Sequence, residues 1–254
     1  MDGSRDTIPT NLRQLLVLEE LARLGSATAT EVNAKLGLPK PTIHRLFATL
    51  EEEGFVQRTL DGRGWEPGPR ARAMSAGLLS TTSIRAARLA ILRDVSREIG
   101  ETCNIALPGN DGMVYLERVE TEWPLRIQLP VGTRVPFHCT ASGKLFLSSL
   151  PTAARQRFIK TLTLRRYTAN TITDGSRLDA EASRIDANGH ATDNGEFMEG
   201  MIAVGVPVHD ANGRLLATLT SHAPVQRMDL STALTFLPRM QQAARELGSL
   251  VTPD

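Results

Sequence analysis

The sequence predicts an α+β protein of two domains joined by a helix. Two observations carry this prediction. The first 73 residues contain three short amphipathic helical patterns, and a glycine-containing hairpin pattern follows them. After residue 100, strand-like runs paired across tight-turn sequences alternate with helical segments, an order that is typical of helices packed on an antiparallel sheet. We therefore expect an N-terminal domain at residues 1–73, a hinge and linker helix at 74–100, and a C-terminal domain at 101–254.

The composition is that of an ordinary globular chain. Its 254 residues carry 29 Lys+Arg against 28 Asp+Glu, and 41% of them are apolar. No run approaches the roughly 18 apolar residues needed to span a bilayer, and residues 1–6 lack the apolar core of a signal peptide. Two cysteines can form neither a disulfide framework nor a four-ligand zinc site. These features predict a cytoplasmic protein with no membrane partner.

The three N-terminal helices are predicted from apolar spacing and from capping residues. Apolar residues between positions 12 and 24 recur about every 3.6 residues, and Gly25 ends this helix. Thr28 stands three residues before Glu31, which is the spacing of a capping box, and the short helix that it opens ends at Gly37. A third helix follows with Pro41 in its first turn, where proline is tolerated.

A hairpin completes the N-terminal domain. Residues 55–58 and a segment around Trp65 flank a turn at 60–64 that contains two glycines. Two helices joined by a tight glycine turn and followed by a two-stranded wing make up the winged helix-turn-helix plan, in which the second helix of the pair lies in the major groove of DNA. The alternative is a small three-helix bundle whose polar face is merely solvated.

The charge of the N-terminal domain is neutral overall but unevenly distributed. Residues 1–73 contain ten Lys+Arg and ten Asp+Glu. Between positions 35 and 50 there are three basic residues, one histidine and no acid, and three glutamates follow at once. Affinity for DNA would then come from this stretch and the wing. Weak non-specific binding and a modest salt dependence should follow.

The remainder of the chain is predicted element by element. Residues 69–83 are rich in small and polar side chains and indicate a hinge, after which Ser83 can cap a helix. Asn110-Asp111-Gly112 and the segment 210–213 are turn signals that join two hairpins. The expected strands are 102–107, 113–119, 125–129, 201–208 and 214–221, and the later helices are 151–162, 176–188 and about 229–250. Pro238 should kink the last helix.

Three separated blocks of sequence resemble one family. The run from Gly37 to Leu46, continuing through Ala48-Thr49-Leu50-Glu51, resembles the helix-turn-helix of IclR-family transcriptional regulators. Val131-Gly132 with Pro136 and the run from His138 to Lys144 resemble the effector domain of that family, as do Glu199-Gly200 and Pro207-Val208. The resemblance covers nearly the whole chain, from about residue 12 to residue 250.

The resemblance implies a bacterial regulator with a winged helix-turn-helix, a linker helix and a C-terminal effector domain similar to a GAF domain on an antiparallel sheet. Members of the family dimerise through the DNA-binding half, often form dimers of dimers, and repress or activate catabolic operons. We expect a repressor that binds double-stranded operator DNA and a small organic acid. A transcriptional activator, and a small-molecule-binding protein without DNA binding, are the alternatives. The residues expected at the DNA are Thr28, Thr30, Lys40, Pro41, Thr42, His44, Arg45, Thr49, Arg58 and Arg63.

The resemblance also implies a set of effector-binding positions, with two departures from the family pattern. These positions are Ile127, Ala141, Ser142, Asp193, Met201, Ala203, Thr220 and His222. Many members have cysteine where this chain has Ala203, which leaves more room here. Small hydroxyl residues or glycine are common where His222 stands. A histidine there could carry charge, or could hydrogen-bond an anion or hydroxyl group.

Alternatives remain open at several of these positions. His222 could equally be a surface or dimer-contact residue, and Asp193 could serve only an Asx turn. Arg126 is a possible anion partner, but strand alternation places it opposite Ile127, so we expect Ile127 in the pocket wall. Trp123 could close the pocket mouth or belong to the core or an interface.

Enzyme chemistry is not expected. His138 and Cys139 are adjacent along the chain, and adjacent side chains of an extended segment point apart, which does not suit a nucleophile and its base. The run from His138 to Lys144 lacks the first glycine and the final Ser or Thr of a phosphate-binding loop. The five histidines show no paired metal-ligand spacing. The sequence therefore predicts neither catalysis, nor a cofactor, nor a metal.

Overall fold

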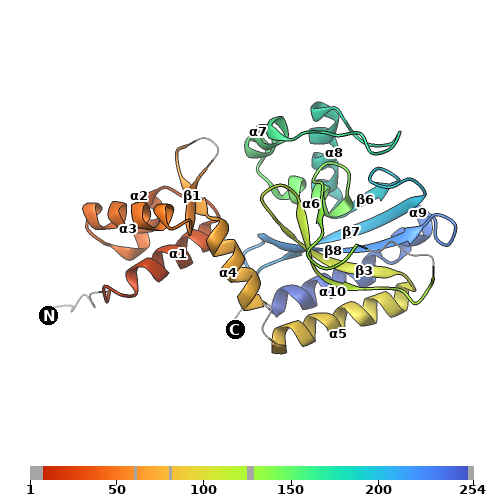
Figure 1. The fold of residues 1–254 in the computed structure, drawn as a ribbon, viewed down its shortest axis with the longest axis horizontal. Helices are drawn as coiled ribbons and strands as arrows, with labels where there is room; N and C mark the ends of the chain where they lie inside the picture. The colour runs from red at the N-terminus through yellow and green to blue at the C-terminus, as the bar shows by residue number, and fades with distance from the viewer. Residues whose placement is uncertain (1–7, 60–61, 80–81, 125–128, 251–254) are drawn as a thin grey trace. The chain divides into compact units, whose positions relative to one another are not determined.

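The structure is a computed structural model that describes residues 8–59, 62–79, 82–124 and 129–250 (Figure 1). Its contacts divide the chain into two compact units, Met1–Thr81 and Thr82–Asp254, and each is described by itself. None of the helices in the described part is long and apolar enough to cross a membrane. The strand predicted at 125–129 falls mostly outside the described residues, and so do Arg126 and Ile127.

The first unit contains the predicted three helices and hairpin. The helices are α1 (Arg13–Leu24), α2 (Ala29–Leu36) and α3 (Lys40–Glu52), and β1 (Val56–Arg58) pairs antiparallel with β2 (Trp65–Pro67). Thr28 and Glu31 form the predicted capping box at the start of α2, and Gly37 ends this helix with a left-handed φ of 63°. The core of the unit comprises Val17, Leu21, Val32, Ile43, Phe47, Leu50, Val56 and Trp65, with Ala27 and Ala29.

The structure differs from the expected hinge at 69–83. Residues Pro69–Leu79 form a helix, α4, and the next helix, α5 (Thr82–Ile99), begins one residue before the predicted cap Ser83. Three of the small residues that indicated a hinge, Ala71, Ala73 and Ala76, are alanines, and alanine has the highest helix propensity of any residue. Pro69 is the first residue of α4, where its missing N–H costs no hydrogen bond.

The second unit is built on a six-stranded antiparallel sheet of order β5-β4-β3-β8-β7-β6. Both predicted hairpins are confirmed, as β3–β4 and β7–β8. The short edge strands β5 and β6 were not predicted. The strands are β3 (Thr102–Pro108), β4 (Met113–Val119), β5 (Arg134–Val135), β6 (Ala191–Asn194), β7 (Met201–His209) and β8 (Leu215–Pro224).

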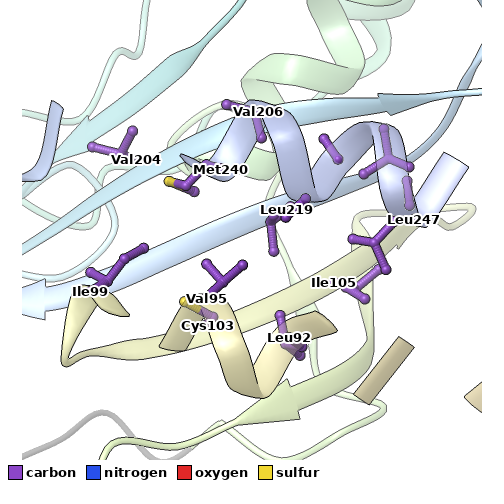
Figure 2. Packing of buried hydrophobic residues seen from close by; sticks show 14 of the residues in the cluster. Leu92, Val95, Ile99, Cys103, Ile105, Val204, Val206, Leu219, Met240 and Leu247 are labelled. Carbon is purple, nitrogen blue, oxygen red and sulfur yellow. The ribbon is translucent and has the colours of Figure 1, made fainter. Parts of the chain in front are cut away.

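Helices cover both faces of this sheet (Figure 1). On one face, α5 and α10 (Leu237–Ser249) bury apolar residues against β3, β7 and β8, among them Leu92, Leu219 and Met240 (Figure 2). On the other face lie α6 (Ala141–Ser149), α7 (Thr152–Thr161) and α8 (Gly175–Asn188).

The single C-terminal helix predicted at 229–250 is instead two helices, α9 (Leu230–Thr235) and α10. The chain breaks at Phe236, which is the C-cap of α9 and the N-cap of α10. Pro238 therefore stands in the first turn of a new helix, where it needs no hydrogen-bond partner, and it does not kink a continuous one.

Candidate DNA-binding surface and effector site

The turn between α2 and α3 is fixed by one side chain. The amide of Asn33 donates from Nδ2 to the carbonyl oxygen of Leu38 at 2.7 Å, and its Oδ1 accepts from the N–H of Leu38 at 2.9 Å. This pair of bonds spans Gly37 and ties the end of α2 to the residue before Pro39, the N-cap of α3. The angle between the two helices is therefore held by hydrogen bonds as well as by packing.

α3 presents a polar face to solvent. Ile43, Phe47 and Leu50 are buried in the core. The predicted DNA contacts on this helix lie on its other side: Lys40, Pro41, His44, Arg45 and Thr49 are exposed, and Thr42 is half-buried. The helix N-terminus, where backbone N–H groups have no intrahelical partner, lies at Lys40.

The other predicted DNA contacts are less uniform. Thr30 and Arg63 are exposed. Thr28 is half-buried, and its hydroxyl belongs to the capping box with Glu31. Arg58 stacks on Trp65, with its guanidinium carbon 3.8 Å from the ring centroid, and its Nε donates to Glu51 at 3.2 Å. Arg58 and Thr28 thus have structural partners within the unit.

Lys35, at the start of the basic stretch, is paired within the fold. Its ammonium lies 2.9 Å from Oε2 of the buried Glu20, which also binds Arg23. These two cations lower the pKa of Glu20 to about 2. The positive charge that α3 offers to a partner therefore comes from Lys40 and Arg45.

The second unit gathers four predicted effector positions on the sheet face that α6 covers. Thr220 and His222 alternate along β8 and share this face, because side chains two residues apart in a strand point the same way. Ser142, in the first turn of α6, lies with its hydroxyl 3.4 Å from that of Thr220. Ala203 of β7 stands directly opposite His222.

Thr220 and His222 are connected by Asn104, a residue that was not predicted from the sequence. Asn104 of β3 accepts from the hydroxyl of Thr220 at 3.0 Å and contacts Nε2 of His222 at 2.6 Å. Since Oδ1 of Asn104 is the acceptor for Thr220, its Nδ2 donates to Nε2, which must then carry no proton. Hydrogen bonds thus run from Ser142 through Thr220 and Asn104 to His222, and we call these four residues the polar relay.

These contacts determine whether His222 carries a charge at neutral pH. Burial, together with the nearby charge of Arg118, lowers the pKa of His222 to about 3. A protonated imidazole would also place an N–H against the amide N–H of Asn104. At neutral pH, His222 is therefore uncharged, with its proton on Nδ1, and offers a hydrogen-bond donor without a charge.

The apolar positions of the predicted site pack closely. Ala141 and Ala203 belong to one buried cluster, and Met201 at the start of β7 is half-buried. Gly205 lets α6 approach the sheet, because a Cβ at this position would lie 2.9 Å from the Thr220 methyl and 3.0 Å from Leu145. This packing brings the first turn of α6 over the polar relay.

Asp193 makes the hydrogen bonds of the turn that was considered as the alternative to effector binding. It lies on β6 opposite Ala203, and its Oδ1 accepts from the backbone N–H of Glu196 at 2.7 Å and of Phe197 at 3.4 Å. It therefore caps a turn. Burial, with the charge of Glu196 as a further cause, raises the pKa of Asp193 to about 7.

We expect Asp193→Asn to change how stability depends on pH. An acid whose pKa rises on folding stabilises the fold below its usual pKa of 3.8, and this stabilisation is lost as the pH rises through 7. Asparagine keeps an oxygen for both backbone donors but has no charge. From pH 5 to pH 8, the free energy of unfolding of the variant should therefore gain about 2 kcal/mol relative to the wild type.

Urea unfolding at both pH values measures this difference. Asp186→Asn, at an exposed position of α8, is the matched control and should show no such gain. A difference between Asp193→Asn and the wild type that does not vary with pH would contradict the expectation.

Comparisons with known proteins agree with both units. Residues 76–249 match the family described as bacterial transcriptional regulator IclR, C-terminal, and residues 12–60 match the IclR helix-turn-helix domain. The chain belongs to the IclR family. It is 40% identical over 237 residues to the probable transcriptional regulator SauR of Cupriavidus necator. The matched region covers 93% of this chain and 94% of that protein.

Solved structures of IclR proteins share the fold. The Thermotoga maritima IclR structure is 26% identical, with a TM-score of 0.63 over 94% of this chain and 97% of that one. A double mutant of the inducer-binding domain of PobR from Acinetobacter, in complex with 3-hydroxybenzoic acid, is also 26% identical. It has a TM-score of 0.59 over 64% of this chain and 95% of that chain.

The protein is therefore an IclR-family transcriptional regulator, with a helix-turn-helix DNA-binding region and a C-terminal effector-binding domain, and the family is not one of enzymes. The chemistry of Cys139 agrees with this, because burial raises the pKa of its thiol far above the usual range. Within the described residues, no group of three or more His, Cys, Asp or Glu could hold a metal ion.

A hollow of about 510 Å³ lies elsewhere in the effector-binding unit, beside β7 and α10. It is lined by residues such as Pro207, His209 and Arg245, and by none of the predicted effector positions. The candidate effector site of this IclR protein therefore remains the face that bears the polar relay.

Proposed function

We propose that this protein is a repressor that binds a palindromic operator as a homodimer and responds to a small organic acid in its C-terminal unit. The observation that carries the effector proposal is the polar relay on the sheet face beneath α6. The double mutant of the related PobR domain is in complex with 3-hydroxybenzoic acid, and a ligand with an acid group and a hydroxyl group suits a face that offers several hydrogen-bonding groups. A regulator that acts on chromosomal DNA would work in the cytoplasm.

The helix α3 supports the proposed DNA binding. Lys40, His44, Arg45 and Thr49 are exposed on it with the half-buried Thr42 beside them, and its apolar side packs on the core. The remaining contacts that we propose are Thr28, Thr30, Pro41, Arg58 and Arg63. Two subunits reading two half-sites combine their binding energies, which a domain with no net charge requires. A dimer of dimers would extend the same principle.

We expect Arg45→Ala to weaken binding to the operator by about 10- to 100-fold, and binding to random duplex far less, because a base-reading arginine is worth about 1–3 kcal/mol of discrimination. The measurement is a mobility-shift titration at fixed salt with the DNA upstream of the protein's own gene. Arg93→Ala removes the same charge from an exposed position of α5 and should leave both affinities unchanged.

An equal loss on operator and random DNA would mean that Arg45 contacts only phosphate. A wild type that shifts no upstream DNA specifically would favour the alternative of a small-molecule-binding protein without DNA binding. Reporter expression in a deletion strain separates the two directions of regulation. A rise without effector supports the repressor, and a fall supports an activator.

A further inference from the structure

Three consecutive glutamates, Glu51, Glu52 and Glu53, follow the basic stretch at the end of α3. A carboxylate close to bound DNA repels the phosphates, so an acidic run at this position opposes the affinity that the basic stretch provides. The three side chains differ in their surroundings. Glu52 is exposed, and Glu53 binds Arg70 of α4 in an exposed ion pair, whereas Glu51 is half-buried and contacts the wing, the hairpin of β1 and β2.

The carboxylate of Glu51 bonds to both strands of the wing. Its Oε1 accepts from Nε of Arg58 on β1 at 3.2 Å, and its Oε2 accepts from Nε1 of Trp65 on β2 at 3.3 Å. Arg58 and Trp65 are directly opposite in the register of the hairpin, and the guanidinium of Arg58 lies over the Trp65 ring. One side chain of α3 therefore holds a pair of residues that spans the width of the wing.

Apolar packing brings the wing and α3 together but does not fix their relative orientation. Trp65 is buried, and the centroid of its ring lies 4.5 Å from that of Phe47 on α3. Hydrophobic contact is non-directional, whereas a hydrogen bond weakens steeply when its angle is distorted. Because the two oxygens of Glu51 bond to different strands, a rotation of the wing against α3 would break at least one of these bonds.

The opposite end of α3 is also held by a side chain. Asn33 of α2 makes two hydrogen bonds to the backbone of Leu38, at 2.7 and 2.9 Å, just before α3 begins. α3 is thus tied to α2 at its start and to the wing near its end. Groups that bind a ligand must be held within about 0.5 Å of the productive geometry, and the residues that hold them need not touch the ligand.

We propose that Glu51 is a positioning residue for DNA recognition, which fixes the wing relative to α3 so that both reach one operator half-site together. This inference rests on the proposed operator binding. Glu51 does not itself bind DNA, and its charge is balanced by Arg58. A wing released from α3 still meets phosphates in many arrangements, so non-specific binding persists without Glu51. Its loss therefore lowers the preference for the operator.

The test is a mobility-shift titration of the full chain at fixed salt, with the DNA upstream of the protein's own gene and with random duplex. The variants are Glu51→Ala, which removes both bonds, and Glu51→Gln, which keeps an oxygen for Trp65 but loses the ion pair with Arg58. The matched controls are Glu52→Ala and Glu52→Gln, which remove the same charge from the neighbouring exposed position. Circular dichroism checks that each variant is folded.

The quantity compared is the ratio of operator affinity to random-duplex affinity. A variant that is merely less stable loses both affinities in proportion to its folded fraction, which leaves this ratio unchanged. We expect Glu51→Ala to lower the ratio by about 5- to 30-fold, the net contribution of one to two hydrogen bonds, and Glu51→Gln to lower it by about threefold or more. Both Glu52 controls should keep the wild-type ratio, although the loss of a negative charge raises both of their affinities.

If Glu51→Ala does not fold, Glu51→Gln carries the test. A ratio that stays at the value of the matched Glu52 variants in the folded Glu51 variants overturns this inference and leaves the operator binding standing. A wild type that has no preference for the upstream DNA overturns both.

Discussion

Replacing Lys144 by methionine should destabilise the effector-binding unit by about 3–5 kcal/mol, the cost of leaving one partner of a buried ion pair alone. Lys144 is 1% exposed, and its ammonium is bound to Glu196 and lies 3.7 Å from Glu181. Methionine fills a similar volume, so the loss would be electrostatic and would not come from a cavity. The buried Oε2 of Glu196 already has no hydrogen-bond partner in the part of the chain that the structure describes.

The ion pair also positions the site. Glu196 lies in the turn that Asp193 caps, and the carbonyl oxygen of Glu196 accepts from the hydroxyl of Thr171 at 2.7 Å. Lys144 thereby ties this turn to α6, whose first turn covers the polar relay. Loss of the lysine should loosen the turn and α6 together.

Hydrogen–deuterium exchange along a urea series measures the opening of α6 and α8 in the full chain. Lys160→Met, at an exposed position of α7, is the matched control and should change stability by no more than about 0.5 kcal/mol. The double variant Lys144→Met/Glu196→Gln removes the unpaired charge and should recover most of the loss. Equal stability of Lys144→Met and Lys160→Met would show that the pair contributes nothing net.

The sequence was most informative where structure depends on local rules. The apolar spacing of α1 and α3, the capping box of Thr28 and Glu31, and the glycine turns of both hairpins each act within a few residues, and all appear as predicted. The hinge predicted at 69–83 is wrong over residues 69–79 for a local reason too, because the alanines of this segment favour a helix.

The effector face depends on pairings that no local pattern reveals. The family resemblance indicated Ser142, Thr220 and His222, and the structure brings these three together. Asn104 was missed because its partners are more than a hundred residues away in the chain. A polar Asn104 within an apolar strand was the available signal.

An ion pair connects β4 to the linker helix α5. Glu117 is 3% exposed and accepts from Arg88 at 3.1 Å and from Arg85 at 3.2 Å, both on α5. α5 is the first helix after the DNA-binding unit in the chain. β4 pairs with β3, the strand that bears Asn104 of the polar relay. A movement of these strands on effector binding would therefore reach α5 through one buried ion pair.

Glu117→Gln should therefore uncouple the two sites. We expect the variant to bind the effector acid with an affinity within about threefold of the wild type. The acid should change operator affinity less than about twofold, whereas in the wild type a change of about 5- to 150-fold is typical of such coupling. Mobility shift with and without saturating acid measures both proteins.

A control variant on α5 tests whether the loss of response is specific to the buried Arg88–Glu117 pair. Glu98 of α5 is exposed and binds Arg239 of α10 at 2.8 Å, so Glu98→Gln should keep the full response. If Glu117→Gln is too unstable to measure, Arg88→Met/Glu117→Met removes both charges, which restores stability in many buried pairs, and should be equally uncoupled. A response retained in either Glu117 variant would mean that coupling takes another route. Coupling requires that the effector bind two arrangements of the protein with different affinities. A retained response would show that the contacts of Glu117 do not differ between these two arrangements.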